Sequence, residues 1–305
     1  MDKLIEAFLK SYKIKGRAER TIEEMNGRLK HFTKYLASNN ISHIDDITRD
    51  VVRSYQTYLY HCKKPNGSPY AVTHQNLLLG AVKQFIRYLN ESGYLVSDPA
   101  QHVQYAREPK RLPSSVLTQS EARKIIQMPD TKCLLGYRDK TILEVLYSTG
   151  IRSLELINLA LNDVDCHDGF LLIKGKGGKE RVVPVGKIAC CYLENYMAVI
   201  RPELVKDKKN NHVFLSIRGN KLSRSGINQF IKNYTKQAGI RKNVHCHTFR
   251  HTCATLMLKN KANIRMLQKL LGHASLDTTQ VYTHLSIADL KDVHKKCHPR
   301  EKDQS

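Results

Sequence analysis

The chain has 305 residues, of which 50 are Lys or Arg and 28 are Asp or Glu, so its formal net charge is +22 at neutral pH. That length predicts two domains, and 41% hydrophobic residues suffice for a core in each, which excludes a disordered chain. A large charge of one sign favours a polyanionic partner, nucleic acid before an anionic membrane surface, and argues against an enzyme for small neutral substrates.

The sequence carries no signal for export or for a membrane span. Its first residues, MDKLIEAFLKSYKIK, lack a long apolar core, and no apolar run reaches the roughly 18–20 residues of a spanning helix. The eight cysteines contain no C-x-x-C pair, which predicts reduced thiols and neither a disulfide framework nor a zinc ribbon. We therefore expect a soluble, cytoplasmic protein with no membrane partner.

The N-terminal third predicts only helices, the first of them starting near residue 2. Apolar residues follow the helical period over Arg17–Leu36, Ile47–Tyr60 and Ala71–Leu89, and the turn sequence KKPNGSP separates the last two. Residues 1–98 are therefore predicted to form a helical bundle. Residues 99–115 contain three prolines and no apolar period, which predicts an extended interdomain linker. The net charge is +6 for residues 1–110 and +16 for the remainder.

Residues 116–305 predict a second, mainly helical domain. Thr118 followed by Glu121 is the pattern of a capping box at a helix start, and a second helix over Tyr137–Ser148 ends at Gly150. Two runs rich in Leu, Ile and Val flank the sequence GKGGK and predict a β-hairpin with a glycine turn; these runs are Phe170–Lys174 and Arg181–Val185. From Leu222 onward the pattern is helical.

Four local patterns carry candidate chemistry, although each alone has a plain structural interpretation. Arg152 follows a glycine break at a helix start, where an arginine can face a bound anion. Lys176 lies at the tip of the predicted hairpin, within reach of a phosphate but equally consistent with a solvated turn. His247 and Arg250 share a helix face with His251. The two histidines have the spacing of a zinc-protease helix, but a threonine stands where that motif needs glutamate.

The fourth pattern is His273, just past the helix-ending Gly272, with Tyr282 nine residues later. Taken together in their order and spacing, the four patterns resemble the tyrosine recombinase (phage integrase) family. The residues that carry the resemblance are Arg152, Lys176, His247, Arg250, His273 and Tyr282, within the stretches TGIRSLEL, GKGGKERVVPV, HTFRH and LGHASLDTTQVYTH. The N-terminal helices are similar to the family's core-binding domain. The resemblance implies a mainly α fold, with a SAM-like helical core-binding bundle and a helical catalytic domain that includes a small antiparallel hairpin or sheet.

The resemblance also implies an enzyme that cuts and rejoins DNA at specific sites. Tyr282 would attack a phosphodiester, form a 3′-phosphotyrosine and release a 5′-hydroxyl; the covalent intermediate stores the bond energy, so no ATP, metal or cofactor is expected. Arg152 and Arg250 would clamp the phosphate. Lys176 would be the general acid for the leaving oxygen, and His247 would assist proton transfer at the tyrosine. His273 would hydrogen-bond the scissile phosphate.

One departure from the family pattern concerns the support of Arg152. The family usually reads R-x-S-E-L after this arginine, whereas Leu154 occupies the usual serine position here, with Glu155 and Leu156 in register. His251 matches a histidine often found after the family's H-x-x-R, and we assign it a structural role. The apolar residues of the tail, residues 285–305, predict an amphipathic helix. The resemblance implies that this helix docks on a neighbouring protomer; packing on its own domain is the alternative.

The implied partners are duplex DNA at short inverted-repeat core sites and further copies of the chain. We expect a homotetramer on synapsed DNA, or a hetero-tetramer with a related recombinase. A DNA-binding accessory factor without catalysis and a type IB topoisomerase remain the alternatives. No additional N-terminal arm-binding domain is expected, which favours an Xer-like or mobile-element recombinase. The sequence leaves integration or excision, replicon resolution and inversion open.

Overall fold

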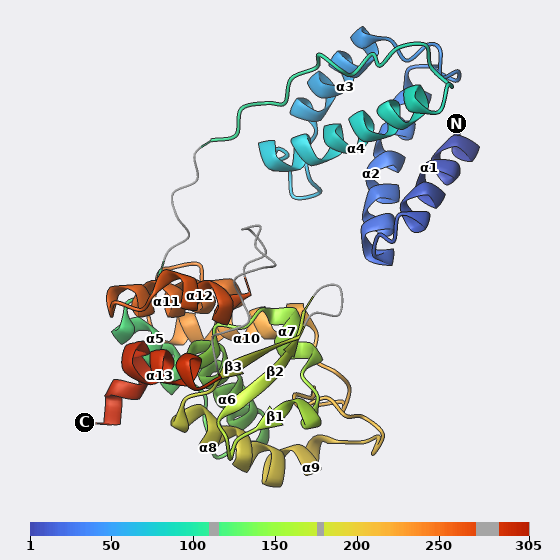
Figure 1. Cartoon of the computed structure of the whole chain (residues 1–305). Coiled ribbons are helices and arrows are strands. Elements are labelled where there is room, and N and C mark those ends of the chain that lie inside the picture. The colour runs from blue at the N-terminus through green and yellow to red at the C-terminus, as the bar shows by residue number, and fades with distance from the viewer. Residues whose placement is uncertain (110–115, 176–179, 273–286, 305) are drawn as a thin grey trace. The chain divides into compact units, whose positions relative to one another are not determined.

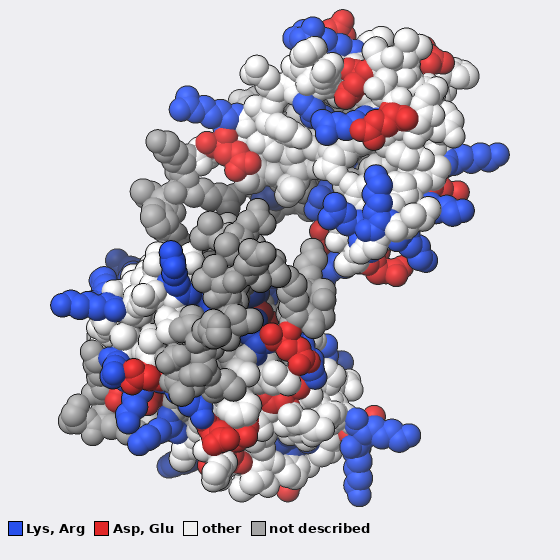
Figure 2. Space-filling model, viewed as in Figure 1, with Lys and Arg blue, Asp and Glu red and all other residues white. Residues whose placement is uncertain are grey.

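The computed structural model describes residues 1–109, 116–175, 180–272 and 287–304, and the side chains of all but 287–289 and 302–304 among them. The chain forms two compact units, Met1–Arg111 and Leu112–Ser305 (Figure 1). Each unit holds a hydrophobic core of its own. Lys and Arg side chains are spread over the visible face of both units (Figure 2). Among the described residues, no helix combines the length and the apolar character that a bilayer span needs.

Unit 1 is a bundle of four helices. Their bounds are α1 Asp2–Ile14, α2 Glu19–Ser38, α3 Arg49–His61 and α4 Val72–Glu91. The helices predicted from apolar periodicity lie within two residues of the last three. Large aromatic side chains fill the bundle, and Phe32, Tyr55 and Phe85 are fully buried. The predicted helical bundle is confirmed.

The segment after α4 differs from the predicted linker. Ala100 and Val103 are buried in the core of unit 1. Asn76 of α4 exchanges two hydrogen bonds with the backbone of Ala106, at 2.9 and 3.0 Å, and Lys83 Nζ donates to the carbonyl of Val103 at 2.6 Å. The first half of the predicted linker therefore belongs to unit 1. The proline and charge pattern indicated an extended backbone but did not reveal that α4 supplies its hydrogen-bond partners.

Unit 2 is a helical domain with one small sheet (Figure 1). Its elements are α5 Gln119–Gln127, α6 Leu134–Thr149, α7 Ser153–Asn158, β1 Val164–Asp165, β2 Phe170–Lys174, β3 Glu180–Pro184, α8 Lys187–Asn195, α9 Arg201–Leu204, α10 Arg224–Gln237, α11 Cys246–Lys259, α12 Ile264–Leu271 and α13 Ile287–Cys297. A 3₁₀ turn follows α7 at Leu161–Asp163, a π-helical turn at Tyr196–Ile200 joins α8 to α9, and a 3₁₀ segment, Pro299–Gln304, follows α13.

The three strands pair antiparallel in the order β1-β2-β3. Phe170 lies opposite Pro184 and Lys174 opposite Glu180, which is the register of a hairpin. The predicted hairpin and the capping box at Thr118 are both present, the latter with reciprocal bonds to Glu121. The expected fold class, mainly α with a small antiparallel sheet, is confirmed.

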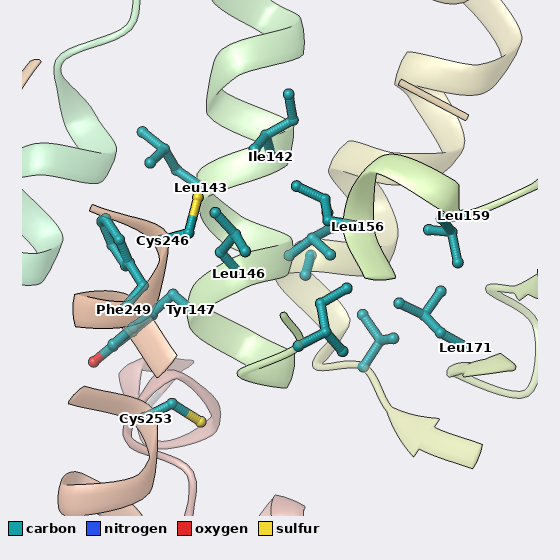
Figure 3. Packing of buried hydrophobic residues seen from close by; sticks show 14 of the residues in the cluster. Ile142, Leu143, Leu146, Tyr147, Leu156, Leu159, Leu171, Cys246, Phe249 and Cys253 are labelled. Carbon is teal, nitrogen blue, oxygen red and sulfur yellow. The ribbon is translucent and has the colours of Figure 1, made fainter. Parts of the chain in front are cut away.

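Helix α6 is the centre of this unit, and it is buried on every side over most of its length. Figure 3 shows Phe249 and Cys253 of α11 on one side of α6 and Leu156 of α7 on the other. All of these side chains belong to one hydrophobic cluster. Because α6 packs against both α7 and α11, it fixes the positions of the two elements that carry Arg152 and Arg250.

The C-terminal segment packs on its own unit in this structure. The rings of His294 and His298 are buried and stacked, with centroids 4.6 Å apart. Their Nε2 atoms donate to the carbonyls of Ser148 and Tyr147 near the C-terminal end of α6, at 2.8 and 2.9 Å. Arg300 forms an ion pair of 2.6 Å with Glu144, which is fully buried. In the single chain, the tail thus packs on its own unit, which was the alternative to the expected docking on a neighbouring protomer.

This packing predicts a pH-dependent tail. Burial lowers the pKa of His294 to about 4 and that of His298 well below its ordinary value, and His298 Nδ1 accepts a hydrogen bond from the Arg300 amide, which requires a neutral ring. The unfolded chain binds more protons than the folded one below pH ~6.5, so stability falls as pH falls from there towards ~4, by about 1.4 kcal/mol per histidine per pH unit.

We expect the C-terminal segment to become sensitive to proteolysis between pH 6.5 and 5. The measurement is limited proteolysis of wild type and of a His294→Gln, His298→Gln double variant. The double variant should lose most of the pH dependence, because its replacements do not titrate. An equal pH dependence in both proteins would contradict the assignment to these histidines.

Candidate active site

Arg152 is positioned by the sharp turn between α6 and α7. Gly150 ends α6 in the left-handed conformation, with φ of +61°, and a Cβ atom there would come within 2.9 Å of Leu271 in α12. Arg152 is the N-cap residue of α7, and its amide donates to Glu155 Oε2 at 2.8 Å. Leu154 points outward, with 52% of its surface exposed. The leucine in place of the family's serine therefore leaves the turn intact, because Glu155 supplies the cap.

Arg250 lies in the buried part of α11 and joins the ends of two helices. Its Nη1 donates to the carbonyl of Gly150 at 2.8 Å, and its Nη2 donates to the carbonyl of Leu271 at 2.7 Å. A cation suits these carbonyls, since the C-terminal end of a helix carries partial negative charge. Burial, together with the nearby positive charge of Arg152, lowers the pKa of Arg250 to about 10, so the side chain remains charged at neutral pH.

The two arginines meet at the C-terminal end of α12. Arg152 Nη2 donates to the carbonyl of Gly272 at 2.6 Å, next to the Leu271 carbonyl that Arg250 contacts. A guanidinium has five N–H donors. Arg250 uses two of them on described residues, and the side chain of Arg152 also uses two. Each arginine thus keeps donors for an anion, and the structure brings together these two residues predicted from separate motifs.

A third arginine at this place was not among the predicted site residues. Arg181 of β3 donates from Nη1 and Nη2 to the two oxygens of Glu155, at 2.9 and 2.8 Å. Glu155 also accepts a bond of 2.9 Å from Arg152 Nη1. Arg181 lies inside the stretch GKGGKERVVPV, where the run of apolar residues that predicts the strand gives no indication of the partner of its side chain. Only the tertiary structure, which brings Arg181 of β3 next to Glu155 of α7, reveals the contact.

The electrostatics of this cluster favour an anionic ligand. Burial would raise the pKa of Glu155, but the hydrogen bonds from Arg181 and Arg152 outweigh burial and hold the pKa below its ordinary value. Two guanidinium groups hydrogen-bond this carboxylate and the guanidinium of Arg250 lies near it, so the four side chains carry a net charge of +2. Like charges held this closely are stabilised by an anion between them, and a guanidinium fork matches two oxygens of a phosphate.

His247 lies at the start of α11, three residues before Arg250. Its ring is exposed and stands edge-on to His245, with centroids 6.2 Å apart. Partial burial lowers the pKa of His247, and the positive charges of Arg224 and Arg250 lower it further. A neutral imidazole at pH 7 can accept a proton, as the predicted role requires. His251, one turn further along α11, is exposed as well.

Three of the predicted site residues, Lys176, His273 and Tyr282, lie outside the described residues. Their neighbours in the sequence are described. Lys176 belongs to the connection between the end of β2 at Lys174 and the start of β3 at Glu180, and His273 directly follows Gly272, the C-cap of α12. The described part of the site thus consists of Arg152, Arg250 and His247 with the added pair Glu155 and Arg181.

Comparison with known proteins identifies the family of this chain. Residues 115–288 match the phage integrase family, and residues 5–93 match the N-terminal SAM-like domain of phage integrases. The chain is 36% identical over 301 residues to tyrosine recombinase XerD of Staphylococcus epidermidis, covering 98% of this chain and all of that protein. This chain belongs to the phage integrase family of tyrosine recombinases. It is therefore a DNA recombinase, an enzyme of site-specific recombination.

A further relative agrees with the assignment, and two solved structures share the fold. The recombinase is 35% identical to tyrosine recombinase XerC 2 of Ralstonia nicotianae, over 98% of this chain and 86% of that one. Its fold matches a lambda integrase dimer bound to a core site, with a TM-score of 0.69 and 18% identity over 92% of this chain and 99% of that one. It also matches the XerH recombinase bound to its difH substrate, with a TM-score of 0.65 and 21% identity over 94% and 82%. The comparisons do not support the alternatives of an accessory factor or a topoisomerase.

Proposed function

We propose that this recombinase cuts and rejoins duplex DNA by transferring the scissile phosphate to Tyr282. The observation that carries the proposal is the convergence of Arg152 and Arg250 on consecutive carbonyls at the end of α12, with donors left for an anion. Charge that develops on the non-bridging oxygens in the transition state would fall between the two guanidiniums. Preorganised donors of this kind are typically the largest single contribution to catalysis.

The proton and bond changes balance without a further reactant. The Tyr282 oxygen forms a bond to phosphorus as the bond from phosphorus to the 5′-oxygen breaks. His247 takes the proton of the tyrosine hydroxyl, and Lys176 gives a proton to the leaving 5′-oxygen. His273 donates a hydrogen bond to the phosphate. Rejoining reverses these steps when a 5′-hydroxyl attacks the phosphotyrosine.

The proposed partner is duplex DNA at short inverted-repeat core sites, bound by several copies of the chain. The net charge of +22 supports a broad, sequence-independent grip on the DNA backbone. Among proteins of the same fold, one structure is a lambda integrase dimer on a core site and another is a tetramer on a Holliday junction. We propose a tetramer on synapsed DNA in the cytoplasm, made of this chain alone or together with a related recombinase.

We further propose an Xer-like organisation in which residues 1–98 are the core-binding domain and residues 116–305 are the catalytic domain. Residues 99–115 join the two, and the first half of this segment packs on the core-binding domain. The match to XerD relatives over 98% of the chain supports this division of labour. In the assembled state, the tail over residues 285–305 would leave its own unit and dock on a neighbouring protomer.

The test is a covalent adduct on nicked DNA. A duplex selected from a random-sequence library by binding to the protein is nicked close to the cleavage position, so that the leaving fragment diffuses away and religation stops. The wild-type protein should become covalently attached, and peptide mapping should place the nucleotide on Tyr282. Attachment to another residue, or no attachment to any selected duplex, would refute the proposal.

A further inference from the structure

Arg181 makes contacts that link three separate parts of the proposed active site. It lies on β3, directly after the hairpin connection that contains Lys176. Its two Nη atoms hold Glu155, the partner of Arg152, and its Nε donates to the carbonyl of Leu270, in the last turn of α12 before His273. The side chain makes three hydrogen bonds and is only 17% exposed.

Glu155 has no hydrogen-bonding capacity to spare. Oε1 accepts from Arg181 Nη1 and Arg152 Nη1, and Oε2 accepts from Arg181 Nη2 and the Arg152 amide. Two bonds to each oxygen use the roughly four lone-pair sites of a carboxylate. Arg181 occupies the bidentate position, which leaves Arg152 a single side-chain bond to the carboxylate and its second bond to Gly272.

Loss of Arg181 would change what Arg152 binds. A buried carboxylate that loses two charged donors would attract the remaining guanidinium into bidentate pairing, because fork-to-fork pairing is the stronger geometry. That pairing would turn the donors of Arg152 towards Glu155 and away from a phosphate. Arg181 therefore keeps Arg152 available.

The end of α12 is shaped to receive Arg181. Gly272 is in the left-handed conformation, and a Cβ atom at this position would lie 3.0 Å from both Cζ and Nε of Arg181. Any side chain here would press on the guanidinium group. The absence of a side chain at residue 272 thus serves a close contact as well as the helix end.

We infer that Arg181 is a positioning residue of the recombinase, which holds Arg152 in its phosphate-binding geometry through Glu155 and ties β3 to the end of α12. This inference rests on the proposed function, since it assumes that Arg152 contacts the scissile phosphate. Arg181 is thus a fourth cation of the proposed site, besides Arg152, Arg250 and Lys176. It acts through Glu155 and does not contact the DNA.

The experiment measures single-turnover cleavage of the nicked duplex by Arg181→Met. We expect a rate about 10²-fold below wild type, the size of loss that a 1 Å misplacement of a reacting group produces. The Kd for the duplex should change by less than about threefold, since the other cations remain. Arg181→Lys should not restore the rate, because an ammonium cannot hold both carboxylate oxygens. A rate within threefold of wild type for Arg181→Met would overturn the inference.

A neutral substrate separates positioning from simple destabilisation of the fold. A methylphosphonate at the scissile position removes the negative charge that Arg152 stabilises. On this substrate the defect of Arg181→Met should shrink to a few fold, whereas a damaged fold would lower both rates alike. Equal defects on the two substrates would overturn the inference.

A double-mutant cycle with Glu155→Gln tests the route of the effect. If Arg181 acts through Glu155, Arg181→Met should lower the rate by no more than about threefold in the Glu155→Gln background. A 10²-fold loss in both backgrounds would contradict that route. The matched control is Lys174→Met, which removes another hairpin cation, one paired with Asp163 at 2.8 Å, and should leave the rate unchanged. If the wild-type protein forms no adduct, the proposed function is wrong. Failure of the inference about Arg181 is a different result, in which wild type forms the adduct and Arg181→Met forms it equally fast.

Discussion

Replacing Tyr282 with phenylalanine is expected to abolish covalent attachment to nicked DNA, a loss of at least about 10⁴-fold in the single-turnover rate. The change removes the one oxygen that would form the bond to phosphorus, and removal of an enzyme nucleophile has effects on this scale or larger. Binding of the duplex should remain within about threefold of wild type, because the substitution alters no charge. The measurements are adduct formation on a denaturing gel and a binding titration.

The matched control is Tyr192→Phe, which makes the same chemical change in the same unit. The ring of Tyr192 packs against Tyr137 and lies beneath the ammonium of Lys140, and these contacts need the ring and not the hydroxyl. Its rate should equal that of wild type. An adduct that persists in Tyr282→Phe would exclude Tyr282 as the nucleophile and direct the search to the other tyrosines.

Substituting Arg250 with lysine is expected to lower cleavage by about 10²- to 10³-fold and also to destabilise unit 2. Removing a preorganised donor from a charged transition state costs about 3–4 kcal/mol. Lysine keeps the charge but cannot contact the carbonyls of Gly150 and Leu271 and a phosphate at once. Each buried carbonyl that loses its donor costs about 1–3 kcal/mol of folding free energy. Single-turnover cleavage and urea unfolding measure the two effects.

Arg201→Lys is the control that separates stability from catalysis. Arg201 of α9 is also buried, and it donates to two carbonyls, those of His212 at 2.9 Å and Asn210 at 2.6 Å. Its substitution should reduce the free energy of unfolding by a similar amount and leave the cleavage rate unchanged. If both variants lose cleavage in proportion to their stability, Arg250 is a structural residue and the proposed phosphate clamp is wrong.

Local patterns in the sequence were sufficient to predict most of the helices and the hairpin. Helices α2, α3 and α4 each have one apolar face, and the capping pair Thr118 and Glu121 marks the start of α5. Both signals come from residues no more than four positions apart, so the local sequence is enough to predict these helices. The predicted α6 is four residues too short, three of them at its start, because its first turn carries no polar residue and Cys133 gives no capping signal.

The C-terminal tail shows where such patterns stop being informative. The apolar residues of the tail predicted an amphipathic helix, and α13 is present at Ile287–Cys297. The apolar face of this helix could be buried equally well against a neighbouring protomer or against its own unit, so the pattern does not distinguish the two. The hydrogen bonds of His294 and His298 to the end of α6 decide the question for the single chain, and no local pattern encodes a contact to residues almost 150 positions away.

The sequence by itself determined the family and the six residues proposed to act on DNA, because each motif is a short contiguous pattern whose residue types are set by the chemistry. The tertiary structure decided how those residues cooperate. It placed Arg152 and Arg250 on neighbouring carbonyls at the end of α12, and it added Arg181 and Glu155, which hold Arg152 in place. Those contacts depend on the packing of α11 on α6 and of α12 on α11 and β3, and long-range packing leaves no signature in the order of neighbouring residues.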